Sequence, residues 1–172
     1  MAFTLETDRL RLREFTLADT AFTLELINEP AWHEFIGDRG LRTEDGAQEY
    51  LEQAILGSYQ RHGFGLYHVA LSVDDTPVGM CGLVRRDVLD APDLGFAILE
   101  RHWRRGYAFE ASAAVLAHAR EQLGLDPILA VTNRANARSI ALLEKLGFRP
   151  DGTARLTEDA DESALFTTAS EA

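Results

Sequence analysis

The chain has 172 residues, 46% of them hydrophobic and 26% charged, which is typical of a globular domain with a substantial core. We therefore expect a single domain over residues 1–172. The formal net charge of −11 disfavours nucleic-acid binding, because that function needs a basic face.

Apolar residues recur along the chain with the periods of strands and helices. Leu10 and Leu12 alternate with arginines, as in a strand with one buried face. Thr16, followed three residues later by Asp19, is typical of a capping box and predicts a helix start. The elements predicted in chain order are a strand at 9–15, a helix at 16–28, an irregular segment at 31–42, a helix at 43–62, strands at 66–73, 77–84 and 93–99, a helix at 106–122, a strand at 127–132, a helix at 136–146, and strands at 148–152 and 163–168.

This order of elements predicts a mixed α/β fold. A hairpin meander comes first and a βαβα unit second, which predicts a mixed central sheet flanked by helices. Gly79 and Gly82 lie inside one predicted strand, where glycine indicates a bend or the close approach of another backbone.

Several classes of site are not expected. The sequence shows neither an apolar run long enough to span a membrane nor a secretory leader, so we expect a cytoplasmic protein without a membrane partner. The single cysteine, Cys81, lies among apolar residues and predicts a buried structural thiol. The five histidines lack the spacing of metal ligands, so no metal site is expected.

The stretch before the long helix at 106–122 carries Arg104, Arg105 and Gly106. At a helix start the first N–H groups lack internal partners and point together, with the positive end of the helix dipole behind them. This arrangement suits an anion, above all a phosphate, and Gly106 lets a ligand approach the backbone. The alternative is that the two arginines are solvated surface charges.

A second signal lies downstream, in residues 133–148. Asn136 predicts the N-cap of a helix, and Gly147 predicts its left-handed C-terminal end. Together with the arginine-rich turn and the opening Thr-Asp-Arg-Leu-Arg-Leu-Arg at 7–13, this stretch resembles the GNAT superfamily of N-acetyltransferases. The resemblance is to the branch named for the ribosomal-protein acetyltransferases RimJ and RimL, and it runs from about residue 7 to residue 152.

The resemblance implies a fold and a reaction. The fold is a mixed, mostly antiparallel central sheet with splayed central strands, flanked by about four helices. The reaction is direct acetyl transfer from acetyl-CoA to a primary amine, which is either a protein N-terminus or a small cationic amine. A homodimer is a further family-level expectation, and a non-catalytic acyl-CoA-binding regulatory module is the alternative function.

The resemblance also assigns residues to acetyl-CoA. It places the diphosphate on the backbone N–H groups of the turn and the pantetheine arm in the gap between the splayed strands. The cofactor-binding residues that it implies are Phe96, Ile98, Arg104, Arg105, Gly106, Tyr107, Ala108 and Asn136.

Two catalytic residues and two substrate contacts follow from the same resemblance. Ser139 protonates the leaving thiolate, or alternatively is an ordinary hydroxyl in the first turn of a capped helix. Asp93 acts as a base or orients a water, or alternatively is a strand-end charge in solvent. Trp32 and Phe35 lie in the segment that lines the acceptor side in the family, with packing against the sheet as the alternative.

Overall fold

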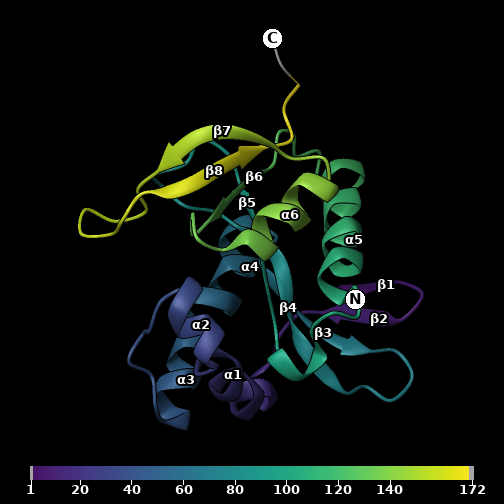
Figure 1. Cartoon of the computed structure of the whole chain (residues 1–172). Helices are drawn as coiled ribbons and strands as arrows, with labels where there is room; N and C mark the ends of the chain where they lie inside the picture. Colours follow the sequence, from purple (N-terminus) through teal and green to yellow (C-terminus); the bar gives the residue numbers. More distant parts are fainter. Residues whose placement is uncertain (1, 171–172) are drawn as a thin grey trace.

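An eight-stranded sheet runs through the computed structural model, which describes residues 2–170 (Figure 1). The strands are β1 (Thr4–Glu6), β2 (Leu10–Arg13), β3 (Leu66–Leu71), β4 (Pro77–Val84), β5 (Asp93–Ile98), β6 (Leu129–Thr132), β7 (Arg149–Ala154) and β8 (Ser163–Thr167). Their order is β1-β2-β3-β4-β5-β6-β8-β7, and every neighbouring pair is antiparallel except β5 and β6. This mixed, mostly antiparallel sheet confirms the predicted fold class.

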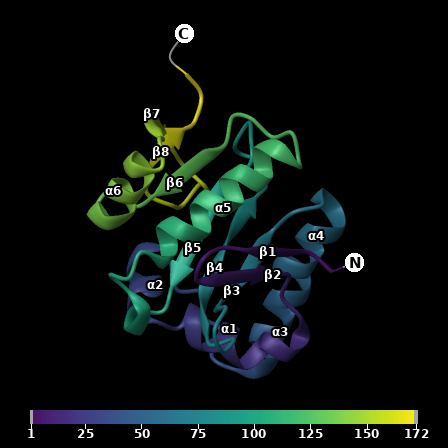
Figure 2. The same ribbon diagram turned by 90° about the vertical axis from the view of Figure 1, so that its right-hand side faces the viewer.

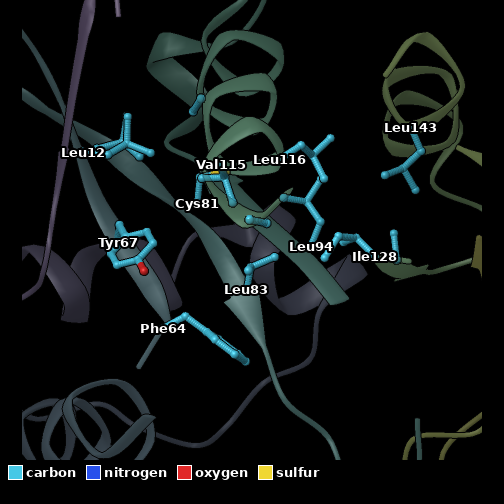
Figure 3. Packing of buried hydrophobic residues seen from close by; sticks show 14 of the residues in the cluster. Leu12, Phe64, Tyr67, Cys81, Leu83, Leu94, Val115, Leu116, Ile128 and Leu143 are labelled. Carbon is cyan, nitrogen blue, oxygen red and sulfur yellow. The ribbon is translucent and has the colours of Figure 1, made fainter. Parts of the chain in front are cut away.

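Helices cover both faces of the sheet (Figure 2). They are α1 (Thr20–Ile27), α2 (Pro30–Phe35), α3 (Glu44–Tyr50), α4 (Gly57–His62), α5 (Tyr107–Glu121) and α6 (Ala137–Lys145), with the 3-10 turns η1 (Leu17–Asp19) and η3 (Glu100–His102) and a π-helical segment η2 (Leu51–Leu56) that joins α3 to α4. On one face, Val115 and Leu116 of α5 pack in a cluster with Cys81 of β4 (Figure 3). On the other face, Met80 of β4 packs in a second cluster with Ile55 and the helices from α1 to η2.

Two of these elements differ from the prediction. The segment at 31–42 is not irregular throughout, because α2 occupies its first part; Pro30 stands in the first turn of this new helix, where proline is well tolerated. β1 lies outside the predicted elements, because its three residues carry no clear apolar alternation. The helix predicted at 43–62 is confirmed as a continuous stretch, although its middle part is π-helical.

Gly79 and Gly82 let β4 lie tightly between its neighbours. A Cβ atom at Gly79 would lie 2.2 Å from the carbonyl oxygen of Ala97 on β5. A Cβ atom at Gly82 would lie 2.1 Å from the carbonyl oxygen of Gly65, just before β3. No side chain fits at these distances, so the predicted close approach of backbones is confirmed.

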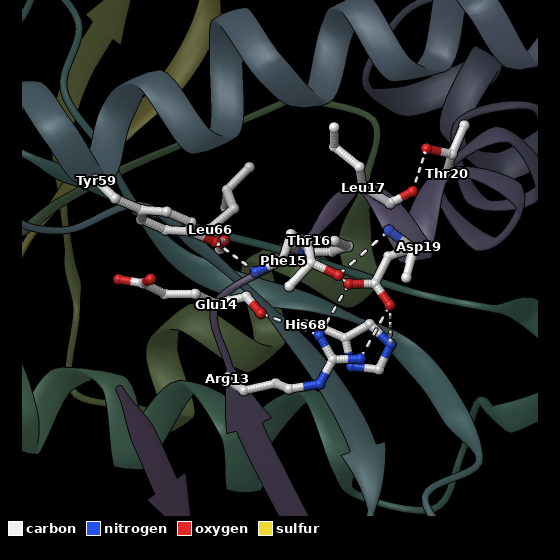
Figure 4. Close-up of polar contacts among 11 residues, drawn as sticks. Arg13, Glu14, Phe15, Thr16, Leu17, Asp19, Thr20, Tyr59, Leu66 and His68 are labelled. Carbon is white, nitrogen blue, oxygen red and sulfur yellow. Dashed lines mark hydrogen bonds and ion pairs between the residues drawn. The ribbon is translucent and has the colours of Figure 1, made fainter. Parts of the chain in front are cut away.

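A buried polar cluster ties η1 to β2 and β3 (Figure 4). Asp19 accepts a hydrogen bond from the N–H of Thr16 at 2.9 Å, which confirms the predicted capping box. The two carboxylate oxygens of Asp19 accept further hydrogen bonds from Arg13 at 2.8 and 2.9 Å. The imidazole of His68 lies 3.9 Å from the same carboxylate, and burial lowers the pKa of His68 to about 4. The cluster therefore anchors the first helical region to the meander.

The central strands β5 and β6 diverge. Within residues 2–170 they pair only through Asp93 and Leu129, near the start of both strands. The N–H of Leu129 also donates to the carbonyl of Pro92 at 2.9 Å, just before β5. Beyond this point the strands separate, which confirms the predicted splay and opens a gap in the middle of the sheet.

Candidate active-site cleft

The gap between β5 and β6 belongs to a cleft of about 1160 Å³. Its walls come from β5, the first turn of α5 and the start of α6, and also from α2 and η2. The predicted site residues that line it are Trp32, Phe35, Asp93, Phe96, Ile98, Arg104, Gly106, Tyr107, Ala108, Asn136 and Ser139. Arg105 does not line the cleft; its backbone carbonyl instead accepts a hydrogen bond from Arg9 at 2.7 Å.

The turn before α5 presents backbone N–H groups to the cleft. Arg104 and Gly106 both have left-handed backbone angles, with φ of 63° and 81°, and Gly106 is the N-cap of α5. Among the described residues, no side chain bonds to the first N–H groups of α5. With the helix dipole behind them, these groups form a site suited to a phosphate.

The edge of β5 also directs backbone groups into the gap. The N–H of Leu99 donates to the carbonyl of Val78 at 2.9 Å. Because inward and outward groups alternate along an antiparallel pair, the N–H and C=O groups of Phe96 and Ile98 point away from β4 and toward the gap. Trp103 Nε1 donates to the carbonyl of Ile98 at 2.7 Å. As far as the described residues go, the Ile98 N–H and both backbone groups of Phe96 remain for a ligand.

The start of α6 forms a further part of the wall. Asn136 Oδ1 accepts a hydrogen bond from the N–H of Ser139 at 3.2 Å, which confirms the predicted N-cap. The helix ends as predicted, with Gly147 at φ 96° and the N–H of Phe148 donating to the carbonyl of Leu143 at 3.0 Å. The Ser139 hydroxyl is half-buried at the cleft, and no hydrogen bond to it is formed by any residue from 2 to 170.

Asp93 stands at the first position of β5 and is only 1% exposed. The alternative that it is a strand-end charge in solvent is therefore wrong. Burial raises the pKa of Asp93 to about 6, although the guanidinium of Arg86, whose Nε lies 3.1 Å from Oδ1, partly offsets this rise. A carboxyl group with this pKa is largely ionised at neutral pH and still basic enough to accept a proton.

Residues 9–149 match the family described as "Acetyltransferase (GNAT) domain". The chain belongs to the GNAT acetyltransferase family. It is 26% identical over 153 residues to "Uncharacterized N-acetyltransferase YoaA" of Bacillus subtilis (strain 168), a match that covers 88% of this chain and 85% of the relative. The sequence-based prediction of an N-acetyltransferase family is thus confirmed.

Solved structures show the same fold. A GnaT-family acetyltransferase from Bordetella pertussis is 30% identical, with a TM-score of 0.80 and coverage of 97% of this chain and 99% of that chain. RimL, a ribosomal L7/L12 α-N-protein acetyltransferase in complex with coenzyme A, is 15% identical, with a TM-score of 0.81 and coverage of 96% and 97%. The second match shows the fold alone.

The part of the cleft on the α2 side is walled by side chains. We call it the acceptor half, because the family resemblance predicts that the segment at 31–42 lines the acceptor side. Trp32 is 5% exposed and packs in the second core cluster while it also lines the cleft, so both predicted roles fit its position. Phe35 is half-buried at the cleft wall. The Arg39 guanidinium lies 4.9 Å from the centre of the Tyr50 ring, and both residues line the same wall.

Three residues of the acceptor half are absent from the predicted site, namely Arg39, Tyr50 and Arg86. Tyr50 lies within the helix predicted at 43–62, but nothing in the sequence shows that the cleft lies against that helix. Arg86 could have been found, because it lies in the connection between two predicted strands. When those strands pair as a hairpin, the connection is brought back beside Asp93.

Other reactive groups of the GNAT chain do not add to the cleft. Cys81 is fully buried, as predicted, and burial raises the pKa of its thiol to about 12. In the described part of the chain, no group of three or more His, Cys, Asp or Glu side chains could hold a metal ion. No helix between residues 2 and 170 is long and apolar enough to cross a membrane.

Proposed function

We propose that this protein transfers the acetyl group of acetyl-CoA directly to a primary amine, a peptide N-terminus or a small cationic amine, with both substrates bound in the cleft at once. The observation that carries the proposal is the uncapped start of α5, whose N–H groups open onto the gap between β5 and β6. A diphosphate needs such donors. The same cleft also contains a buried carboxyl group and a hydroxyl group, at Asp93 and Ser139.

Backbone groups hold acetyl-CoA in this proposal. The N–H groups of Tyr107 and Ala108 bind the diphosphate, and Arg104 adds positive charge beside them. The N–H groups of Phe96 and Ile98 bind the pantetheine arm, and one of them can stabilise the oxyanion. Because Asn136 Oδ1 caps α6, its Nδ2 group remains as a further donor to that arm.

Free-energy estimates indicate how much help the amine needs. A lysine-like amine with a pKa near 10.4 costs about 4.6 kcal/mol to deprotonate at pH 7, whereas an α-amino group costs only about 1 kcal/mol. Holding two reactants in the correct geometry can contribute about 7–11 kcal/mol. Positioning therefore outweighs deprotonation, and a moderate base is sufficient.

Asp93 and Ser139 are the groups that move protons in this scheme. Ionised Asp93 accepts the proton that the attacking amine loses, directly or through a water, while Arg86 keeps the carboxyl group ionised near neutral pH. The Ser139 hydroxyl donates a proton to the departing sulfur and takes up a proton from water in the cleft, so no alkoxide is left. The backbone N–H of Ser139 is bonded to Asn136, which fixes the position of the serine at the cleft.

A thiol-release screen tests the proposal. Purified protein and acetyl-CoA are mixed with N-terminal peptides, polyamines, aminoglycosides or free amino acids, and free thiol is measured over time. Steady release with one amine class is the expected result. CoA binding in calorimetry without release for any amine would instead support a non-catalytic acyl-CoA-binding module, and neither binding nor release would refute both functions.

A further inference from the structure

The arginine-rich segment at 7–13 contacts the turn before α5 from behind. Arg9 lies between β1 and β2, and its Nη1 donates to the carbonyl of Arg105 at 2.7 Å. Its Nε donates to Glu110 Oε2 at 2.7 Å, and its Nη2 lies 2.6 Å from the same oxygen. The guanidinium carbon also lies 4.8 Å from the centre of the Tyr107 ring. One side chain therefore contacts both sides of Gly106.

Glu110, in the first turn of α5, completes the arrangement. Its Oε1 accepts hydrogen bonds from the hydroxyl of Thr7 at 2.7 Å and from the backbone N–H of Arg9 at 2.9 Å. Thr7 is itself held in place, because its hydroxyl accepts from the N–H of Leu10 at 3.0 Å. Both carboxylate oxygens of Glu110 are thus bonded to residues about a hundred positions earlier in the chain.

We propose that Arg9 and Glu110 form a clamp that holds the turn at 104–108 in its anion-binding conformation. This inference rests on the proposed function, in which that turn binds the diphosphate of acetyl-CoA. Arg9 does not line the cleft, so it is a positioning residue that acts through the backbone of Arg105 and through α5.

Two physical reasons explain why the turn needs a clamp. Arg104 has a left-handed backbone angle that side-chain-bearing residues rarely adopt, at a cost of roughly 1–2 kcal/mol, so the conformation persists only where contacts hold it. Glu110 also places a negative charge in the first turn of α5, close to the proposed diphosphate. Arg9 neutralises that charge while it fixes the carbonyl of Arg105.

The geometry requires arginine and not merely a positive charge. Arg9 donates from separate nitrogens to a carbonyl and to a carboxylate, which the planar guanidinium fork allows. A lysine ammonium retains the charge but cannot reproduce the fork. We therefore expect Arg9→Lys to preserve part of the function and Arg9→Gln to preserve less.

Arg11 provides a matched control. It lies in the same segment, is similarly exposed, and forms ion pairs with Glu6 at 2.7 Å and Asp75 at 2.5 Å, away from the turn. Wild type, Arg9→Gln, Arg9→Lys and Arg11→Gln are compared for CoA affinity by calorimetry, with thermal melts to check folding. Arg9→Gln is expected to weaken CoA binding about tenfold, an effect of the size of one hydrogen bond to a charged group. The CoA affinity of Arg9→Lys is expected to lie between those of Arg9→Gln and the wild type.

Steady-state kinetics then separate positioning from general damage. With the amine found in the thiol-release screen, Arg9→Gln is expected to raise KM for acetyl-CoA while kcat and KM for the amine stay within about twofold. An unchanged CoA affinity in folded Arg9→Gln overturns the clamp, and so does an equal loss in Arg11→Gln or a fall in kcat with unchanged KM. If the wild type does not bind CoA, the proposed function itself is wrong. If the wild type binds CoA and folded Arg9→Gln binds it equally well, only the clamp is wrong.

Discussion

The two halves of the cleft present different chemical groups, backbone groups in one half and side chains in the other. The half that we propose to bind acetyl-CoA, which we call the cofactor half, is formed by the turn before α5, the edge of β5 and the start of α6. It offers mostly backbone N–H groups. The acceptor half offers side chains, with Trp32, Phe35 and Tyr50 beside the ion pair of Arg86 and Asp93. Backbone donors depend on caps, glycines and strand pairing, which the fold itself maintains. Side chains on a wall can change without changing the fold, so the acceptor half is where substrate choice can vary.

The most severe test of the cofactor half is Gly106→Glu. A side chain at φ 81° costs roughly 1–2 kcal/mol, and a Cβ there would lie 3.2 Å from Nη2 of Arg9, so the new side chain displaces Arg9 from the turn. A carboxylate added next to the turn also repels an anion bound there, by up to several kcal/mol. We expect CoA affinity in calorimetry to fall about a thousandfold, which corresponds to roughly 4 kcal/mol. A dissociation constant equal to that of the wild type would place the diphosphate elsewhere.

Gly124→Glu is the matched control for this variant. Gly124 also has a left-handed angle, with φ of 65°, but it follows the opposite end of α5, and a Cβ there would meet no atom within 4 Å. It therefore carries a similar backbone strain without the charge at the cleft. CoA affinity is expected to stay close to that of the wild type.

Asp93→Asn tests the acceptor half. Loss of a general base is expected to lower kcat about a hundredfold. CoA affinity is expected to stay unchanged, because the proposal assigns CoA binding to the other half. Because burial raises the pKa of Asp93 above its unfolded value, ionised Asp93 disfavours folding at pH 8, so the variant's Tm there should not fall below that of the wild type. Asp90→Asn is the control, because Asp90 is exposed and lies in the connection just before β5. Unaltered turnover by Asp93→Asn would exclude Asp93 as the base.

The contrast between the halves also explains what could be predicted from the sequence. The N-cap at Asn136, the left-handed Gly147 and the close approach at Gly79 follow from local rules for caps and glycines, and all three are confirmed. The pairing of Arg86 with Asp93 and the position of Tyr50 at the cleft depend on how distant elements pack. No local pattern specifies such packing, so Arg86 and Tyr50 are found only in the structure, whereas the family resemblance already predicts Trp32, Phe35 and Asp93.

The ion pair beside the acceptor predicts a pH profile. Asp93 must be ionised to accept a proton, so kcat/KM for the amine is expected to fall about tenfold per pH unit below about 6, the pKa of Asp93. Arg86→Gln removes the cation that lowers this pKa. The pH below which kcat/KM falls should therefore rise by about one unit. Arg85→Gln is the control, because Arg85 bonds only to the backbone carbonyls of Arg86 and Leu89 among the described residues. If kcat/KM of Arg86→Gln falls at the same pH as that of the wild type, the group that titrates is not Asp93.

The smallest expected effect concerns Ser139, where the two halves meet. Its backbone N–H is bonded to Asn136, so replacing the side chain leaves the cap of α6 intact. Ser139→Ala is therefore expected to lower kcat only about threefold to tenfold, since water in an open cleft can also protonate the departing sulfur. Ser139→Thr keeps a hydroxyl at the position and should retain most of the rate. If both variants turn over at the wild-type rate, Ser139 is an ordinary first-turn hydroxyl and the proton comes from solvent. If both lose the same activity, the space around Ser139 matters and its hydroxyl does not.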